Sequence, residues 1–363
     1  MDGMETLLEM MKMRAMLALT VLPGRAGSAA VTEMAEPALT DGAVLVDTLA
    51  IGICGTDLEI CKGDYGTAPA GADRLVIGHE SLGRVSAAPA GCGLTAGDLV
   101  VGIVRRPDPV PCPNCAVGEW DMCRNGEYTE RGIKGRHGYA SERYRIDPDF
   151  VVKVDPGLAE LGVLLEPTSV VAKAWEHVAR IGARSAAFSP GTALICGAGP
   201  IGLLAALLGV AQGYQVHVVD QVTDGPKPGL VADLGATYHH EPVGALAGRA
   251  DVVIECTGVG QVVVDVLANT APDALVCLTG VSSGGRTVPF DAGEVNREMV
   301  LGNAVVFGSV NANRRHYQAG AAALAAADPA WLARLITRRL PLDHFADALQ
   351  RRPDDVKTVL TLN

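Results

Sequence analysis

The chain has 363 residues, of which 48% are hydrophobic and 20% are charged. This length allows two domains with sizeable cores, and the composition excludes an intrinsically disordered protein. The formal net charge of −11 disfavours nucleic acids and anionic membranes as partners.

The N-terminal segment, residues 1–13, is acidic before it is apolar and lacks the basic start and cleavage site of a secretory signal. No apolar run approaches the ~18 residues that span a bilayer. The nine cysteines are an odd number, which favours a reducing compartment where thiols pack or bind metal. We therefore expect a cytoplasmic protein.

Short runs with strand-like composition, separated by glycine and proline, occupy the first half of the chain. They cover residues 44–53, 81–87 and 98–104. This spacing predicts a compact β-rich domain.

Potential zinc ligands follow the first of these runs and precede the second. Cys54 and Thr56 lie in Cys-Gly-Thr-Asp, and His79 and Glu80 lie in Gly-His-Glu. A thiolate and an imidazole suit zinc, and a carboxylate from Glu80 or Glu166 would leave one position open for water or substrate. This pattern predicts a catalytic zinc. Thr56 could pass a proton outward through its hydroxyl, and Glu80 could be a ligand, an outer-sphere group or a proton acceptor.

A second cluster of cysteines lies in a loop rich in proline and glycine. Cys112, Cys115 and Cys123 have the spacing C-x2-C-x7-C. A structural zinc usually has four protein ligands, and Asp108 is the nearest candidate for the fourth. The alternative is a loop of free thiols without metal.

The second half of the chain alternates strand-like and helix-like runs. Short apolar runs predict strands at residues 192–196, 215–220, 251–256, 274–279 and 304–310. Helices are predicted up to about residue 211 and at residues 229–234. Such alternation indicates a doubly wound parallel sheet. The tail from about Asn313 is expected to be helix-rich and to return to the first domain.

A glycine-rich turn between the first of these strands and its helix matches the dinucleotide-binding pattern G-x-G-x-x-G. The turn contains Gly197, Gly199, Pro200, Ile201 and Gly202. Its glycines would form the tight turn, admit the pyrophosphate and let helix pack on strand, while the helix N-terminus attracts the phosphates.

An acidic residue, Asp220, ends the next strand, where it could bind the adenosine ribose hydroxyls. The same carboxylate would repel the 2′-phosphate of NADP, and Lys227 is the one nearby basic residue that could compensate. We therefore expect NAD to be preferred over NADP.

The order of these motifs resembles that of the medium-chain zinc dehydrogenases, and the likeness is greatest to the archaeal-type glucose 1-dehydrogenases. It extends over nearly the whole chain after about Arg14. The stretches that carry it are Arg105-Arg106-Pro107, Asp121-Met122-Cys123, Glu130-Arg131-Gly132-Ile133, His137-Gly138-Tyr139, Leu164-Leu165-Glu166-Pro167, Arg297-Glu298-Met299-Val300 and Gly308-Ser309-Val310-Asn311.

The resemblance implies an α/β protein with a GroES-like β-rich catalytic domain, residues 14–186 and 313–363, and a Rossmann domain, residues 187–312. It also implies a dimer or tetramer that oxidises a sugar or polyol, most simply glucose at its anomeric carbon, with zinc and NAD(P). Glu130, Glu166 and Asn311 match positions expected to contact the substrate.

Two alternatives remain from the sequence. Val104 and Val170 stand where some members have polar sugar-binding groups, which favours a dehydrogenase of another polyol, amino sugar or cyclitol. A zinc-less nucleotide-binding protein with a regulatory role is the alternative from a different class.

Overall fold

The computed structural model describes residues 15–282 and 287–362, so the expectation for residues 1–13 lies outside the described residues. The chain forms two compact units. The first comprises Met1–Glu166, Arg338–Arg351 and Thr358–Asn363, and the second comprises Pro167–Thr337 and Arg352–Lys357. None of the described helices is long and apolar enough to span a bilayer.

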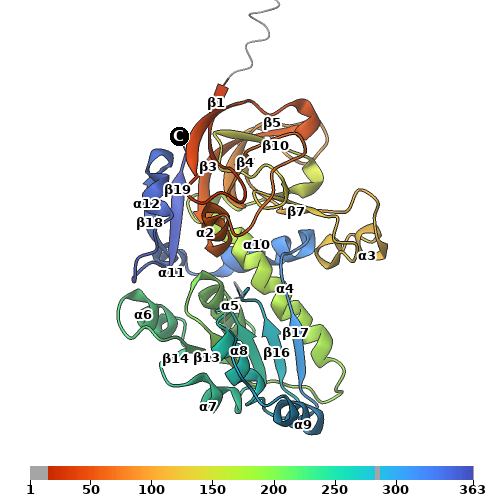
Figure 1. Ribbon diagram of the computed structural model, residues 1–363, viewed down its shortest axis with the longest axis vertical. Helices are drawn as coiled ribbons and strands as arrows, with labels where there is room; N and C mark the ends of the chain where they lie inside the picture. The colour runs from red at the N-terminus through yellow and green to blue at the C-terminus, as the bar shows by residue number, and fades with distance from the viewer. Residues whose placement is uncertain (1–14, 283–286, 363) are drawn as a thin grey trace, which may run out of the picture. The chain divides into compact units, whose positions relative to one another are not determined.

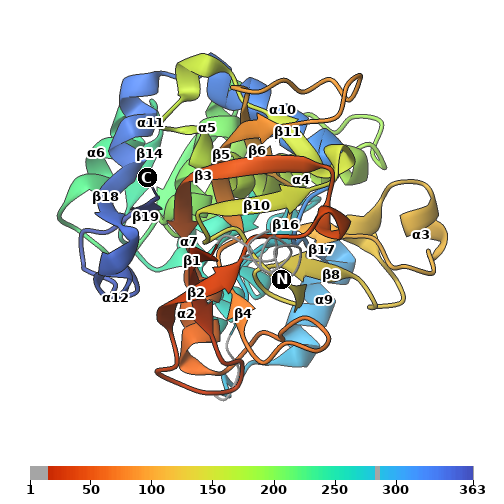
Figure 2. The ribbon, with the colours of Figure 1, turned by 90° about the horizontal axis from the view of Figure 1, so that it is seen from above.

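The first unit is built on a seven-stranded sheet in the order β11-β6-β5-β3-β19-β18, with β10 also paired to β3. Figure 2 shows β3 and β10 side by side. The strands of this sheet are β3 (Val44–Ile53), β5 (Glu80–Ala87), β6 (Leu99–Gly102), β10 (Arg143–Ile146), β11 (Val151–Lys153), β18 (Ile336–Pro341) and β19 (Lys357–Thr361).

Smaller elements complete the first unit. A three-stranded sheet has the order β2-β1-β4, and another has the order β7-β8-β9. The strands are β1 (Ala15–Val21), β2 (Ala30–Ala35), β4 (Leu75–Val76), β7 (Arg105–Arg106), β8 (Thr129–Arg131) and β9 (Gly135–Arg136), and the helices are α2 (Gly55–Lys62), α3 (Pro113–Ala116) and α12 (Phe345–Ala348). Short 3-10 turns lie at η1 (Leu39–Asp41), η2 (Trp120–Met122), η3 (Pro148–Phe150), η4 (Pro156–Leu158), η5 (Gly162–Leu164) and η6 (Leu342–His344).

The burial pattern of β3 explains why residues 44–53 form a strand. Its first six residues alternate between buried and partly exposed, whereas its last four are all buried. Val46 and Ile51 point into a hydrophobic core that also contains Ile77 and Tyr144. The change from alternation to continuous burial places the C-terminal end of β3, next to Cys54, deep in the unit.

Two glycines let the chain pack closely beside His79. Gly78 and Gly132 have φ of 84° and 74°, in the region that favours glycine. A Cβ on Gly132 would lie 2.6 Å from the carbonyl oxygen of Gly78. The turn after β8 therefore lies directly against the backbone that precedes His79.

The second unit contains a six-stranded parallel sheet in the order β14-β13-β12-β15-β16-β17. This is the Rossmann strand order, and the predicted doubly wound sheet is confirmed. The strands are β12 (Thr192–Cys196), β13 (Gln215–Val219), β14 (Thr237–His239), β15 (Val252–Glu255), β16 (Leu275–Leu278) and β17 (Val305–Gly308). The helices, several of which Figure 1 shows beside the sheet, are α4 (Leu165–Gly182), α5 (Pro200–Ala211), α6 (Pro226–Asp233), α7 (Val243–Ala247), α8 (Gly260–Leu267), α9 (Ala292–Gly302), α10 (Arg314–Ala326) and α11 (Pro329–Leu335).

The tail differs from the expectation in one respect. Besides helices it contains β18 and β19, and β19 inserts beside β3 with Val359 opposite Gly52. Its return to the first unit is thus made by strand pairing. The domain limits at residues 186 and 313 stay a prediction. The compact units divide inside α4, after Glu166. Trp175, farther along α4, donates a hydrogen bond to the carbonyl oxygen of Ala205, and both residues belong to the second unit.

Replacing Gly132 by Ala should destabilise the protein more than replacing Gly24 by Ala. Both glycines have positive φ, so each alanine carries a backbone cost of about 1–2 kcal/mol. Only at Gly132 does the methyl also collide with backbone, because nothing lies within 4 Å at Gly24. We expect a further loss of about 1–3 kcal/mol, measured by urea unfolding. Equal destabilisation would contradict the close packing.

Candidate functional site

The predicted zinc motif begins at the N-terminus of α2. Cys54 is the residue that caps this helix, and its backbone amide donates to the Asp57 carboxylate at 2.9 Å. The amide of Thr56 donates in turn to the Cys54 sulfur at 3.2 Å. These two hydrogen bonds form a capping box, which holds the Cys54 side chain in place without a bound ligand.

His79 lies against this sulfur. Its Nε2 atom is 3.1 Å from the Cys54 sulfur, and its Nδ1 atom is 3.5 Å from a carboxylate oxygen of Asp57. Burial lowers the pKa of His79, but Cys54 and Asp57 outweigh that effect, and the net pKa lies well above its usual value. One ring nitrogen thereby faces Cys54 and the other faces Asp57.

Asp57 is a site residue that sequence analysis missed. It is fully buried, and it both caps α2 and orients His79. The signal was present as the capping-box spacing from Cys54 to Asp57, with the acid at the third helical position. An outer-sphere carboxylate of this kind fixes the ring orientation of a metal-binding histidine.

Two further carboxylates join His79. Ligand atoms of His79, Glu80 and Glu166 all lie within 4.8 Å of one another, and all three residues are buried. Glu80 is the first residue of β5 and lies opposite Gly52 of β3. A Cβ on residue 52 would collide with the Glu80 carboxylate. Glu166 occupies the first turn of α4. His79 is thus shared by two groups of possible ligands, one with Cys54 and Asp57 and the other with Glu80 and Glu166.

The nucleotide motif has the expected geometry. Gly197 adopts φ of 96°, Gly199 caps α5 and Pro200 starts it, followed by Ile201. A Cβ on Gly202 would lie 1.8 Å from the carbonyl oxygen of Gly197, so the helix packs as closely on the turn as glycine allows. The free amides of this helix start can bind a pyrophosphate.

Asp220 folds back onto this turn. Its carboxylate accepts hydrogen bonds from the amides of Ala198 at 2.7 Å and Val222 at 3.0 Å, and it pairs with Lys227 at 3.1 Å. Burial raises the pKa of Asp220, but the hydrogen bonds and the charge of Lys227 lower it by more, so the net pKa lies below its usual value. The acid is ionised and paired with the one lysine that sequence analysis singled out.

Comparison with known proteins agrees with this geometry. The alcohol dehydrogenase GroES-like domain family matches residues 40–156, and the glucose dehydrogenase C-terminus family matches residues 159–362. The chain is 39% identical to glucose 1-dehydrogenase 1 of Caldivirga maquilingensis and 38% identical to glucose 1-dehydrogenase of Methanocella arvoryzae, in each case over 96% of this chain and 99% of the relative.

A solved structure is similar as well. It is glucose dehydrogenase of Haloferax mediterranei in complex with NADP, zinc and gluconolactone, with a TM-score of 0.88 and 33% identity over 96% of this chain and 99% of that one. This chain belongs to the glucose dehydrogenase family. The predicted family, the two-part fold and an NAD(P)-dependent oxidoreductase activity are therefore confirmed.

The expected substrate residues lie in different units. Glu130, in β8, is buried in the first unit, two residues before the Gly132 turn that packs on Gly78. Asn311 is buried in the second unit, with φ of 60°, and its side-chain oxygen accepts from the amide of Ala312. Their contact with a sugar stays a prediction.

The cysteine cluster forms as predicted. The sulfur atoms of Cys112, Cys115 and Cys123 lie within 4.8 Å of one another. The Asp108 carboxylate accepts hydrogen bonds from Val110 and Asn125, and the structure does not bring it into this cluster of described residues. Its role as a fourth ligand stays a prediction.

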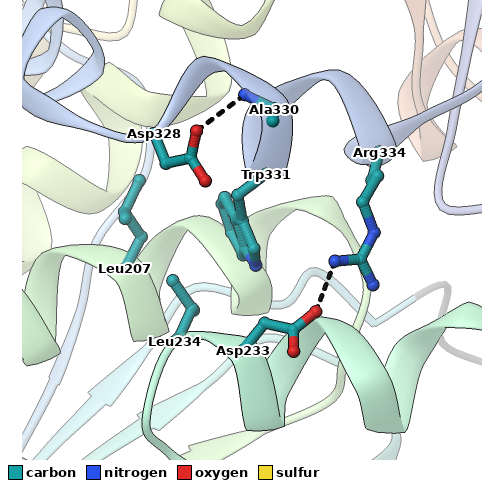
Figure 3. Close-up of a pocket in the computed structure, with 7 residues that line it drawn as sticks. All are labelled: Leu207, Asp233, Leu234, Asp328, Ala330, Trp331 and Arg334. Carbon is teal, nitrogen blue, oxygen red and sulfur yellow. Dashed lines mark hydrogen bonds and ion pairs between the residues drawn. The ribbon is translucent and has the colours of Figure 1, made fainter.

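A surface pocket on the second unit lies apart from these residues. Figure 3 shows Trp331 and Leu234 within it, and an ion pair between Arg334 and Asp233 at its edge. None of its lining residues is a predicted ligand, nucleotide contact or substrate contact. This pocket therefore belongs neither to the candidate zinc site nor to the nucleotide motif.

Proposed function

We propose that this chain oxidises an aldose, most simply glucose, at its anomeric carbon to the lactone. The hydride goes to NAD(P)+ and the hydroxyl proton goes to solvent. The observation that carries the proposal is the buried His79, which belongs to two groups of possible zinc ligands, one with Cys54 and Asp57 and the other with Glu80 and Glu166. The Haloferax relative, which was solved with NADP, zinc and gluconolactone, supports the same reaction.

The donor set fits zinc, because a thiolate, an imidazole and a carboxylate are the ligands that catalytic zinc sites use. We propose Cys54, His79 and one carboxylate, from Glu80 or Glu166, as its ligands. Zinc held there would act as a Lewis acid and lower the pKa of the substrate hydroxyl. Asp57 would hold His79 in a fixed orientation throughout.

The chain's own side chains would manage the proton and the sugar. Thr56 is partly exposed beside the Cys54 sulfur and could pass the hydroxyl proton to solvent. Glu80, if it is not a ligand, would serve as the proton acceptor. We propose that Glu130 accepts hydrogen bonds from sugar hydroxyls, and that Asn311 is a further sugar contact.

The alternative substrates rest on Val104 and Val170. Val104 lies within the hydrophobic core of the first unit, so its apolar side chain serves packing there. Packing alone accounts for a valine at that position, and only the partly exposed Val170 still favours another polyol, amino sugar or cyclitol. A cytoplasmic location and a dimeric or tetrameric assembly remain predictions.

Loss of a proposed ligand should abolish turnover while the nucleotide site survives. Cys54→Ser and His79→Ala should each lose zinc, and kcat should fall by a factor on the order of 10³ or more. NAD binding should persist, because Gly197, Gly202 and Asp220 belong to the other unit. Zinc content, NAD affinity and kcat are measured on the same preparations.

Cys61→Ser is the matched control. Cys61 lies in α2, the helix that Cys54 caps, but burial raises the pKa of Cys61 to about 12 and its side chain packs against the core. The control should keep its zinc and its kcat. If Cys54→Ser and Cys61→Ser lower kcat equally, or if either ligand variant turns over without zinc, the proposed mechanism is wrong.

The cysteine cluster should hold a second, structural zinc. Cys115→Ser should release that zinc, lower the melting temperature and leave the catalytic zinc in place. Cys92→Ser changes a partly buried thiol outside the cluster and should do neither. Metal analysis and calorimetry check this, and a parent protein that contains only the catalytic zinc would contradict it.

NAD should be the better cofactor by kcat/KM. A 2′-phosphate beside the ionised Asp220 is a like-charge contact that costs about 1–3 kcal/mol of binding free energy, or roughly 5- to 150-fold in affinity. Lys227 offsets part of this charge, so Lys227→Met should increase the preference and Asp220→Asn should reduce it. Equal or better turnover with NADP, the cofactor in the Haloferax structure, would refute the preference.

A further inference from the structure

Glu130, the proposed sugar contact, has a buried arginine as its partner. Arg105 and Glu130 lie opposite each other on the antiparallel strands β7 and β8. Nε and Nη2 of Arg105 lie 3.1 Å and 3.0 Å from the same carboxylate oxygen, Oε1. Both residues are 5% exposed, so the pair is shielded from solvent. Removing either partner of such a pair would leave an uncompensated buried charge.

The same guanidinium reaches a second part of the chain. Its Nη1 atom donates to the carbonyl oxygen of Asp121 at 3.1 Å, and Asp121 lies two residues before Cys123. The ring of Tyr128 covers the guanidinium at 3.8 Å. Guanidinium donors form a rigid planar fork, so one planar group links the Asp121 carbonyl to the Glu130 carboxylate.

We propose that Arg105 is a positioning residue that couples the cysteine cluster to sugar binding. The cluster sets the place of the Asp121 carbonyl, Arg105 relays it, and Glu130 takes the orientation that accepts sugar hydroxyls. Both bonds from Arg105 go to Oε1, and the two oxygens of a carboxylate can each accept more than one hydrogen bond. The inference rests on the proposed function, because it assigns Glu130 to the sugar.

The relay predicts an effect on the sugar alone. Arg105→Lys keeps the charge but loses the fork, and Arg105→Met loses both. Each should raise the sugar KM by about 10-fold or more, with kcat within about threefold and NADH affinity unchanged. Calorimetric titration with glucose in the presence of NADH should show the same loss of affinity. A residue needed only for folding would instead lower all of these parameters, or the yield of folded protein.

Arg106→Lys is the matched control. Arg106 is on the same strand and equally buried, but it stacks on Phe150 and donates to the carbonyl of Ile103. It should leave the sugar KM unchanged. The coupling itself is measured by combining Arg105→Met with Cys115→Ser. If the relay exists, Cys115→Ser raises the sugar KM in the parent and has little further effect in Arg105→Met.

The outcomes separate the relay from the proposed function. If the parent oxidises glucose but Arg105→Lys has the parent's sugar KM, or if the effects of Arg105→Met and Cys115→Ser multiply fully, the relay is wrong and the function stands. If the parent neither oxidises nor binds any aldose, the proposed function fails and the inference falls with it.

Discussion

One imidazole ring joins the parts of the candidate site. His79 contacts the Cys54 sulfur with one nitrogen and faces Asp57 with the other, and it also belongs to the cluster with Glu80 and Glu166. These groups come from the end of a strand, the start of α2, the start of β5 and the start of α4. The ring therefore fixes the distance between elements that are far apart in the sequence. Burying several ionisable groups is unfavourable unless they share a proton or bind a metal. This cost is the physical reason to expect a metal-binding role for the cluster.

The sequence predicts the parts of this site that depend on local pattern. Short apolar strands, the glycine-rich turn and the Cys-Gly-Thr-Asp motif each occupy contiguous residues, so their structure follows from nearest neighbours. Strand β12 and helix α5 lie where the pattern places them. The ligand residues could be named for the same reason, because thiol, imidazole and carboxylate side chains occur in short conspicuous motifs.

What depends on long-range contacts could not be predicted. The pairing of Arg105 with Glu130 needs the register of β7 and β8, which no local pattern specifies. Asp108 lies near the cysteines in sequence, yet it turns to Asn125, because two hydrogen bonds satisfy its carboxylate there. Proximity along the chain thus identified the cysteine cluster but not its surroundings. Strand β14 was missed because it is short and only partly buried.

The placement of β19 has a consequence for how the protein is made. On one side, β3 pairs with β5 from Leu45 to Gly52, with two register shifts. On the other side, β10 pairs with the end near Val44 and β19 pairs with the end near Cys54. During synthesis the half of β3 that leads to Cys54 keeps an unpaired edge until residues 357–361 leave the ribosome. An exposed strand edge invites pairing with other chains. Until then, this edge of β3 is the part of the sheet through which nascent chains can aggregate.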